Sequence, residues 1–184
     1  MACGAARLRP TAGVGAMLAG VALALSFACT GARAGTADGY EAGRRGDYAT
    51  ALREFQPAAE KGDRDAQLAL GDMYLRGYGV APDAAVAARW FRKAAEQGDH
   101  EAMNNIGWFY LSGWGVSQDY KQALEWFRKA ADKGNEVAER NIAMMYLQGM
   151  GVKEDKAEAV RWFKKAAAAG DEDSKDALKQ LGAE

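Results

Sequence analysis

The sequence predicts an all-α solenoid, in which pairs of short helices stack side by side. The first observation is a phrase that recurs every 36 residues, as GYGV at 77–80, GWGV at 113–116 and GMGV at 149–152. The second is an aromatic pair that recurs with the same period, at Trp90/Phe91, Trp126/Phe127 and Trp162/Phe163. Repeats of this length indicate stacked arrays, which need at least three units for independent stability.

Residues 1–34 have the layout of a secretory signal peptide. Arg7 and Arg9 form a positive head, an uncharged run follows, and the segment ends in the small-residue phrase ARA. This pattern predicts cleavage after Ala34 and a secreted or periplasmic, bacterial protein without membrane insertion after cleavage. Two alternatives stay open: an uncleaved membrane anchor, since the apolar run is long enough to span a bilayer, or lipidation at Cys29.

Cleavage after Ala34 would leave a chain without cysteine, because Cys3 and Cys29 both lie in the removed segment. Disulfide and thiolate chemistry are then excluded, even in an oxidising compartment. The full chain has a formal net charge of −1, and cleavage would remove arginines but no acidic residue. This charge balance argues against binding to a nucleic-acid backbone.

An incomplete repeat, residues 35–62, precedes the full units. Its phrase GDYATALREFQPAAEKGD places Asp47, Phe55 and Gly62 one period before their counterparts. We expect a short opening helix over residues 39–45, followed by a second helix.

Three full units follow, at residues 63–98, 99–134 and 135–170. In each unit the apolar spacing predicts two helices. In the first unit, one helix should end at Gly77, and the other should begin near the N-capping residue Asp83 and end at Gly98. Residues 171–184 predict a C-terminal capping helix, whose apolar side chains cover the end of the stack, at Ala177, Leu178 and Leu181.

These residues resemble the Sel-one-like repeat family, which is related to the tetratricopeptide repeats. The resemblance lies in the phrases ALGDMYLRGYGV and WFRKAAEQGD and in their two successors. It implies a right-handed superhelix of antiparallel helix pairs and a concave surface lined by the first helix of each unit. It also implies a role in holding other proteins together.

Positions that differ between units are the candidates for partner binding, because identical positions serve the stacking of every unit. By resemblance to the tetratricopeptide arrangement, the variable positions of the first helices face the inner groove. The predicted partner-binding residues are Leu68, Asp72, Asn104, Trp108, Trp114, Arg140 and Met144. Two alternatives stay open for the tryptophans: Trp108 packs against a neighbouring unit, and Trp114 folds over Val116 or a facing helix.

A basic pair also recurs, at Arg92/Lys93, Arg128/Lys129 and Lys164/Lys165. It fits a ladder for an acidic partner, but the preferred interpretation is structural. Cations near a helix C-terminus interact favourably with the helix dipole, and their stems cover apolar surface.

Enzyme chemistry has little support in the sequence. There is one histidine, His100, beside the capping Asp99, and no cluster has metal-ligand spacing. We therefore expect no catalytic residue, no metal and no cofactor, and predict a non-catalytic adaptor that binds a protein or peptide segment. The alternatives are a membrane-tethered scaffold and a cell-envelope hydrolase. Cysteine-rich members of the resembled family have been linked to β-lactam hydrolysis, but the paired cysteines on which they depend are missing here.

Overall fold

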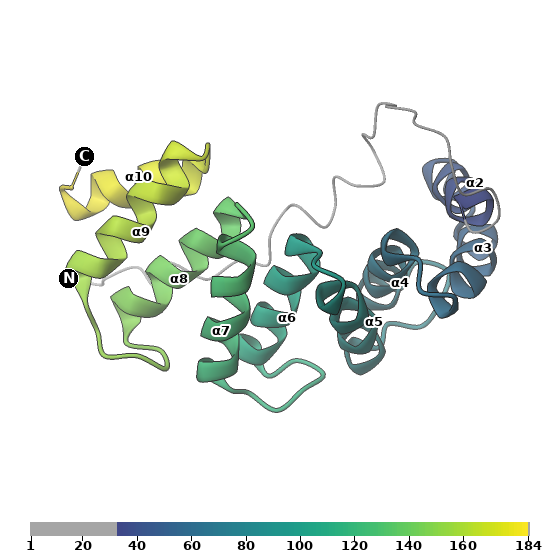
Figure 1. Ribbon diagram of the computed structural model, residues 1–184, viewed down its shortest axis with the longest axis horizontal. Coiled ribbons are helices and arrows are strands. Elements are labelled where there is room, and N and C mark those ends of the chain that lie inside the picture. The colour runs from purple at the N-terminus through teal and green to yellow at the C-terminus, as the bar shows by residue number, and fades with distance from the viewer. Residues whose placement is uncertain (1–32, 184) are drawn as a thin grey trace.

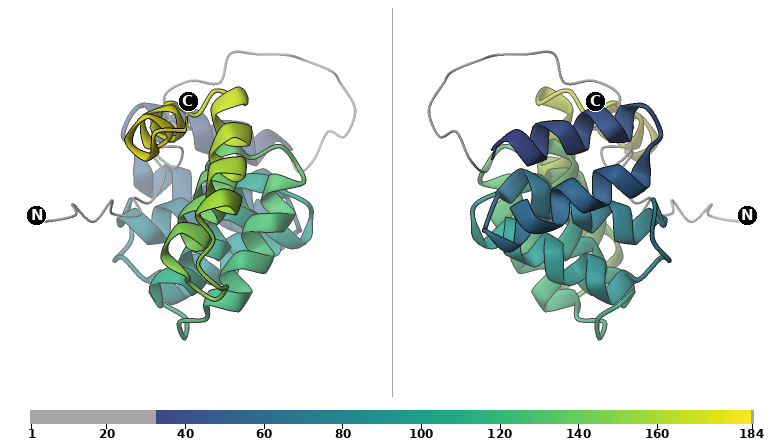
Figure 2. Two further views of the ribbon diagram at one scale, coloured as in Figure 1. Left: turned by 90° about the vertical axis from the view of Figure 1, so that its left-hand side faces the viewer. Right: turned by 90° about the vertical axis from the view of Figure 1, so that its right-hand side faces the viewer.

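The computed structural model describes residues 33–183, and this part of the chain is all helical. The helices are α2 (Arg33–Arg44), α3 (Tyr48–Glu60), α4 (Arg64–Arg76), α5 (Ala84–Glu96), α6 (His100–Ser112), α7 (Tyr120–Ala131), α8 (Glu136–Gln148), α9 (Lys156–Ala168) and α10 (Glu172–Leu181). Each helix packs mainly on the helices that precede and follow it in the chain. The helices form an arc with α2 and α10 at its ends (Figure 1), and the end-on views show how they overlap along it (Figure 2). The predicted α-solenoid of helix pairs is confirmed.

The ends of the helices follow from local sequence. The Asp63 side chain accepts a hydrogen bond from the backbone N–H of Ala66 at the start of α4. The helix ends at Gly77, which has a left-handed φ of 76°. Such a conformation suits glycine, and a Cβ at this position would also lie 2.7 Å from Cγ of Pro82. The same capping recurs in the later units, so the predicted helix boundaries at Asp83, Asp99 and Gly77 are confirmed.

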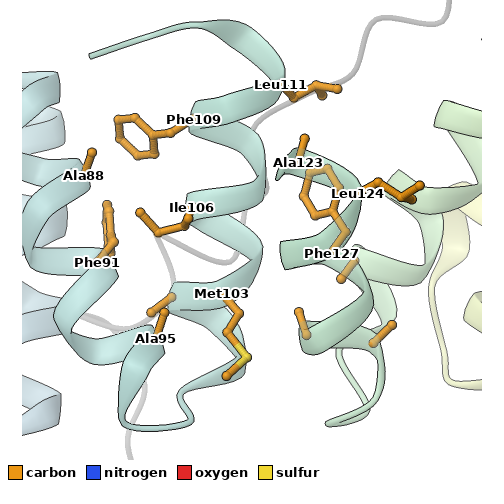
Figure 3. Close-up of a cluster of buried hydrophobic side chains, with 14 of the residues drawn as sticks. Ala88, Phe91, Ala95, Met103, Ile106, Phe109, Leu111, Ala123, Leu124 and Phe127 are labelled. Atoms are coloured by element: carbon orange, nitrogen blue, oxygen red, sulfur yellow. The ribbon is translucent and has the colours of Figure 1, made fainter. Parts of the chain in front are cut away.

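The core joins small residues on the first helix of each pair to a phenylalanine on the second. A Cβ at Gly71 of α4 would lie 2.6 Å from the Phe91 ring of α5, and Gly107 of α6 faces Phe127 of α7 in the same way. Both rings are fully buried. Figure 3 shows Phe91 pointing toward Ile106 of the next unit, so each ring also joins neighbouring pairs.

The recurring tryptophans are less buried than the phenylalanines that follow them. Trp126 only flanks the core, whereas Phe127 beside it is completely buried. The Lys129 ammonium lies 4.2 Å from the centre of the Trp126 ring, and the same contact recurs at Trp90/Lys93 and Trp162/Lys165. These cation–π contacts explain why the aromatic residue and the lysine recur together.

The preceding basic residue joins neighbouring units. The Arg92 guanidinium donates a hydrogen bond to the Tyr110 hydroxyl at 2.6 Å, and Arg128 donates to Tyr146 at 2.9 Å. Five of the six recurring basic residues therefore have contacts within the solenoid, and Lys164 is the exception among the described residues. The predicted interaction of these cations with the helix dipoles stays a prediction.

The N-terminal pair differs from the others in its connection. The turn between α2 and α3 covers residues 45–47, whereas the corresponding turn of the next pair covers 77–83. Gly39 lies against the Phe55 ring, as Gly71 lies against Phe91, so α2 is a first helix in the same register. It begins at Arg33, earlier than the predicted start at Gly39.

Residues 1–32, which hold both cysteines and most of the predicted signal peptide, lie outside the described residues. The predicted cleavage point after Ala34 falls in the first turn of α2. At the other end, α10 buries Leu178 against α9, as expected of a capping helix. Among the described helices, none has the length and hydropathy needed to cross a bilayer.

Candidate functional site

A small pocket, partly open to solvent and with a cavity volume of about 30 Å³, lies among helices α2 to α6. Its lining comes mainly from α2, α3, α4 and α6, with one ring from α5. The lining residues are Tyr40, Gly43, Tyr48, Ala51, Phe55, Leu68, Ala69, Asp72, Met73, Phe91, Glu101 and Asn105. Two predicted site residues, Leu68 and Asp72, are therefore brought together here.

The walls of the pocket are aromatic. The Tyr40 and Phe55 rings meet edge to face with centroids 5.0 Å apart. The Tyr40 hydroxyl donates a hydrogen bond to the backbone carbonyl of Asp65 at 3.2 Å. Burial, reinforced by the nearby Asp65 carboxylate, raises the pKa of Tyr40 well above its usual value, so the ring stays a neutral phenol.

Two carboxyl groups line the same pocket. Asp72 is 9% exposed, and its Oδ1 lies 2.5 Å from Nε of Arg76. Burial raises the pKa of Asp72 to about 6, because the loss of hydration outweighs the attraction of Arg76. Glu101 is half-buried, and burial, followed by the Asp99 carboxylate, raises its pKa. Within residues 33–183, Glu101 makes no hydrogen bond or ion pair.

The other variable positions of the first helices are occupied by internal contacts. Asn104 and Asn141 are both 3% exposed, and the Asn141 amide donates a hydrogen bond to the Asn104 side chain at 3.0 Å. Arg140 forms ion pairs with Asp171 and, at 3.0 Å, with Asp173. Met144 is 8% exposed and packs in the C-terminal core. Their role in partner binding stays a prediction, and the structure gives these three residues contacts within the solenoid.

Trp108 and Trp114 form an aromatic cluster with Phe109. The two indole rings meet edge to face at 5.6 Å, and the Trp114 ring lies over Phe109 at 6.1 Å with 14° between the planes. Trp114 is 46% exposed and Trp108 is half-buried. Trp108 also flanks the core shared by neighbouring units. Packing against a neighbouring unit and partner binding are therefore compatible interpretations of this residue.

The orientation of Trp114 follows from a residue in the preceding unit. Its counterpart Tyr78 stacks on Tyr48 with ring centroids 4.6 Å apart. One period later, Ala84 takes the place of Tyr48, and a Cβ at Gly115 would lie 2.5 Å from its backbone. Because alanine offers no ring, Trp114 lies over its own helix α6 instead. The ring contacts of Trp114 are therefore with Trp108 and Phe109 of α6, and the alternative that it folds over Val116 or a facing helix stays a prediction.

Several pocket residues are not among the predicted site residues. The short turn after α2 shifts Tyr40 out of the 36-residue alignment with the later units. Glu101 and Asn105 lie on the same helix as the predicted residues Asn104 and Trp108, at other positions of the repeat. One signal was available: position 69 is alanine, whereas its counterparts Asn105 and Asn141 are larger.

The described residues hold no group of histidine, cysteine and acidic side chains arranged for a metal ion. His100 is exposed, and its Nδ1 lies 3.1 Å from the side-chain nitrogen of Asn135. Asn135 also caps α8, so this contact ties α6 to the next unit. The chemistry available in the pocket is therefore that of carboxyl groups set among aromatic rings.

The Sel1 repeat model matches the chain at residues 64–99, 100–135 and 137–171. The protein belongs to the Sel1 repeat family. Its fold is that of a Sel1 repeat solenoid, which is consistent with a scaffold for protein interactions. No curated protein matches the sequence.

Solved structures with the same architecture include c5321, described as a protective antigen in uropathogenic Escherichia coli strains with an SLR fold. It is 36% identical with a TM-score of 0.76, over 83% of this chain and 33% of that protein. A Sel1 repeat protein from Oxalobacter formigenes is 32% identical with a TM-score of 0.77, over 82% of this chain and 63% of that one. Cysteine-rich protein B of Helicobacter pylori shares the fold, at 23% identity and a TM-score of 0.57, over 72% of this chain and 95% of that one. The chain thus spans a third to two thirds of the length of the first two proteins.

Proposed function

We propose that this protein is a non-catalytic adaptor that binds an extended segment of another protein along one face of its first helices. The observation that carries the proposal is that residues of the pocket and of the aromatic cluster share one face of α6. Glu101 and Asn105 line the pocket, and Trp108 follows them on the same face of α6 at a spacing of i, i+4 and i+7. A segment that lies across α4 and α6 can therefore contact both features.

The chemistry of this face suits a protein partner. Aromatic anchors set in partly desolvated surroundings supply most of the binding energy in many interfaces. Trp108 and Trp114 provide such anchors, and the pocket beside them offers a space for one side chain.

We propose a secreted or periplasmic location, on the basis of the signal-like pattern in residues 1–34. A membrane-tethered scaffold is the alternative for the same face, and the mass of the exported protein distinguishes the two. A cell-envelope hydrolase draws no support from the likeness to the Helicobacter pylori protein, because at 23% identity the likeness concerns the fold alone.

The test is site-specific crosslinking in the native compartment. A photoreactive amino acid in place of Trp114 should capture a partner protein. The same group in place of Tyr120, an exposed aromatic residue at the start of α7, should not. Adding Trp108→Ala to the Trp114 probe should abolish capture without unfolding the protein. Equal capture from both positions, or capture unaffected by Trp108→Ala, would show that this face is not the binding site.

A further inference from the structure

We infer that the pocket receives a cationic side chain of the bound segment, a lysine or an arginine, with the stem against the aromatic walls and the charge beside Glu101. This inference rests on the proposed function and adds the chemistry of the recognised residue.

The walls suit the aliphatic stem of a long side chain. Tyr40, Tyr48, Phe55 and Phe91 present rings to the pocket, and Ala69 leaves room between them. Lysine and arginine bury their methylene groups on apolar surface while the charged end stays near water. The chain makes such contacts itself, since the Lys93 ammonium lies 4.0 Å from the centre of the Trp90 ring.

The charge around the pocket is negative. Glu101 lines it without an internal partner among the described residues, and Asp72 lies deeper. The carboxylates of Asp63, Asp65 and Asp99 are close enough to act on Tyr40 in the wall. The nearby cations are already engaged, because Arg64 pairs with Asp65 and Asp99, and Arg76 pairs with Asp72.

Other classes of side chain fit less well. An acidic side chain would be repelled by Glu101 and by the desolvated Asp72. A purely apolar side chain would bury the Glu101 carboxylate further without providing a partner for its charge, which carries a desolvation cost. A cation satisfies both the aromatic walls and the unpaired carboxylate.

The later units lack this combination. One period later, Trp108 takes the place of Asp72 and Val137 takes the place of Glu101. Two periods later, Met144 takes the place of Asp72, and Asp173 takes the place of Glu101 but pairs with Arg140 at 3.0 Å. Because the later units stack in the same way without two acids at these positions, the stacking of the repeat does not require the pair. This difference favours a role in recognition.

The decisive experiment uses a matched pair of small probes on the full chain. N-acetyl-lysine N-methylamide and its norleucine analogue have similar stems, but the second lacks the charge. In a titration to millimolar concentrations followed by amide NMR, the lysine probe should shift the resonances of Ala69, Glu101 and Asn105. Shifts that are absent, or equal for the norleucine probe, would overturn the inference.

Two variants and one control variant locate the effect. Glu101→Gln should weaken binding of the lysine probe about tenfold, as expected for a charge-assisted hydrogen bond. Glu125→Gln, which removes an exposed carboxylate on α7, should leave it unchanged and is the matched control. Ala69→Leu fills the pocket and should abolish binding. The asparagines at the corresponding positions 105 and 141 indicate that the helix tolerates a larger side chain there. Equal binding by all the variants would also overturn the inference.

The outcome is separable from that of the proposed function. If crosslinking at Trp114 depends on Trp108 but the lysine probe does not bind, the adaptor function stands and the cationic specificity fails. If the lysine probe binds but no partner depends on Trp108, the pocket chemistry stands and the adaptor face is wrong.

Discussion

The first helices present two halves with the same architecture and different surfaces. In the N-terminal half, α2, α4 and α6 contribute to an open pocket. In the C-terminal half, α6, α8 and α10 are joined by side-chain contacts: Asn104 with Asn141, and Arg140 with Asp171. A variable position in a repeat therefore serves either recognition or an internal contact, and the residues that surround it in the fold decide which.

Two local differences keep the N-terminal half open. Position 69 is alanine, where the next two units have asparagine. The short turn after α2 aligns Tyr40 with Asp72 of the next unit, because Gly39 and Gly71 each lie against a buried phenylalanine. A tyrosine ring thus stands in the pocket wall, where the later units have Asp72, Trp108 and Met144.

The largest expected effect tests what the two halves share. Phe91→Ala and Phe127→Ala should each cost about 3–5 kcal/mol, because each removes a fully buried ring next to a glycine. Trp126→Ala should cost less, since that ring is partly exposed under Lys129. Chemical denaturation of the three variants checks the order, and a tryptophan variant as damaging as the phenylalanine ones would contradict it.

A smaller effect should separate the halves. Arg140→Ala leaves Asp171 buried without its cation and should cost about 2–3 kcal/mol, somewhat below the loss for fully buried pairs. Arg64→Ala in the N-terminal half should cost about 1 kcal/mol or less, because that arginine is half-exposed. Thermal unfolding measures both variants, and equal losses would remove the distinction between a closed half and an open one.

Asp72 makes the stability of the N-terminal half depend on pH. The C-terminal half has no titratable side chain at the corresponding position. Its pKa rises from 3.8 to about 6 on folding, so between these values the native state binds more protons than the unfolded state. Protonation of Asp72 therefore favours the folded state. Its contribution to the free energy of unfolding is fully present below pH 3.8 and is lost as the pH rises through about 6.

Asp72→Asn should remove this dependence. Relative to the wild type, the variant should gain about 2 kcal/mol between pH 4 and pH 7, because each tenfold change in proton affinity corresponds to about 1.4 kcal/mol and this window covers most of the titration. Urea unfolding at several pH values checks the sign. A variant that loses stability relative to the wild type as pH rises would show that Arg76, and not burial, controls this carboxyl group.

The sequence was sufficient for the repeat, the helix pairs and their caps, because each rests on local signals that recur in every unit. Asp83, Asp99 and Gly77 illustrate this. The sequence was less informative about how deeply each side chain is buried. Trp126 and Phe127 are adjacent and both recur, yet only the phenylalanine ring lies against a glycine on the partner helix. That contact depends on how one helix is rotated about its axis relative to its partner helix. The spacing of the repeat in the sequence does not reveal this rotation.

The candidate site was predicted only in part. The variable positions include Leu68 and Asp72, which line the pocket, but they also include Asn104 and Arg140, whose partners, Asn141 and Asp171, lie in the next unit. Variation within one helix cannot show whether a partner is internal or external. The missing information is the pairing between helices about one period apart, which requires coordinates.

The smallest expected effect concerns the two loops that distinguish Tyr78 from Trp114. Tyr78 has a ring beneath it at Tyr48, whereas Trp114 has Ala84. Ala84→Tyr should therefore provide a stacking partner and draw the Trp114 indole off Phe109, with a stability change of about 1 kcal/mol or less. Near-UV circular dichroism should report the loss of the Trp108–Trp114 contact. The converse variant, Tyr48→Ala, should free Tyr78 at a similar cost. If Ala84→Tyr leaves the spectrum unchanged, then the preference of Trp114 for its own helix is set by Trp108 and Phe109, and the preceding unit has no part in orienting the aromatic cluster.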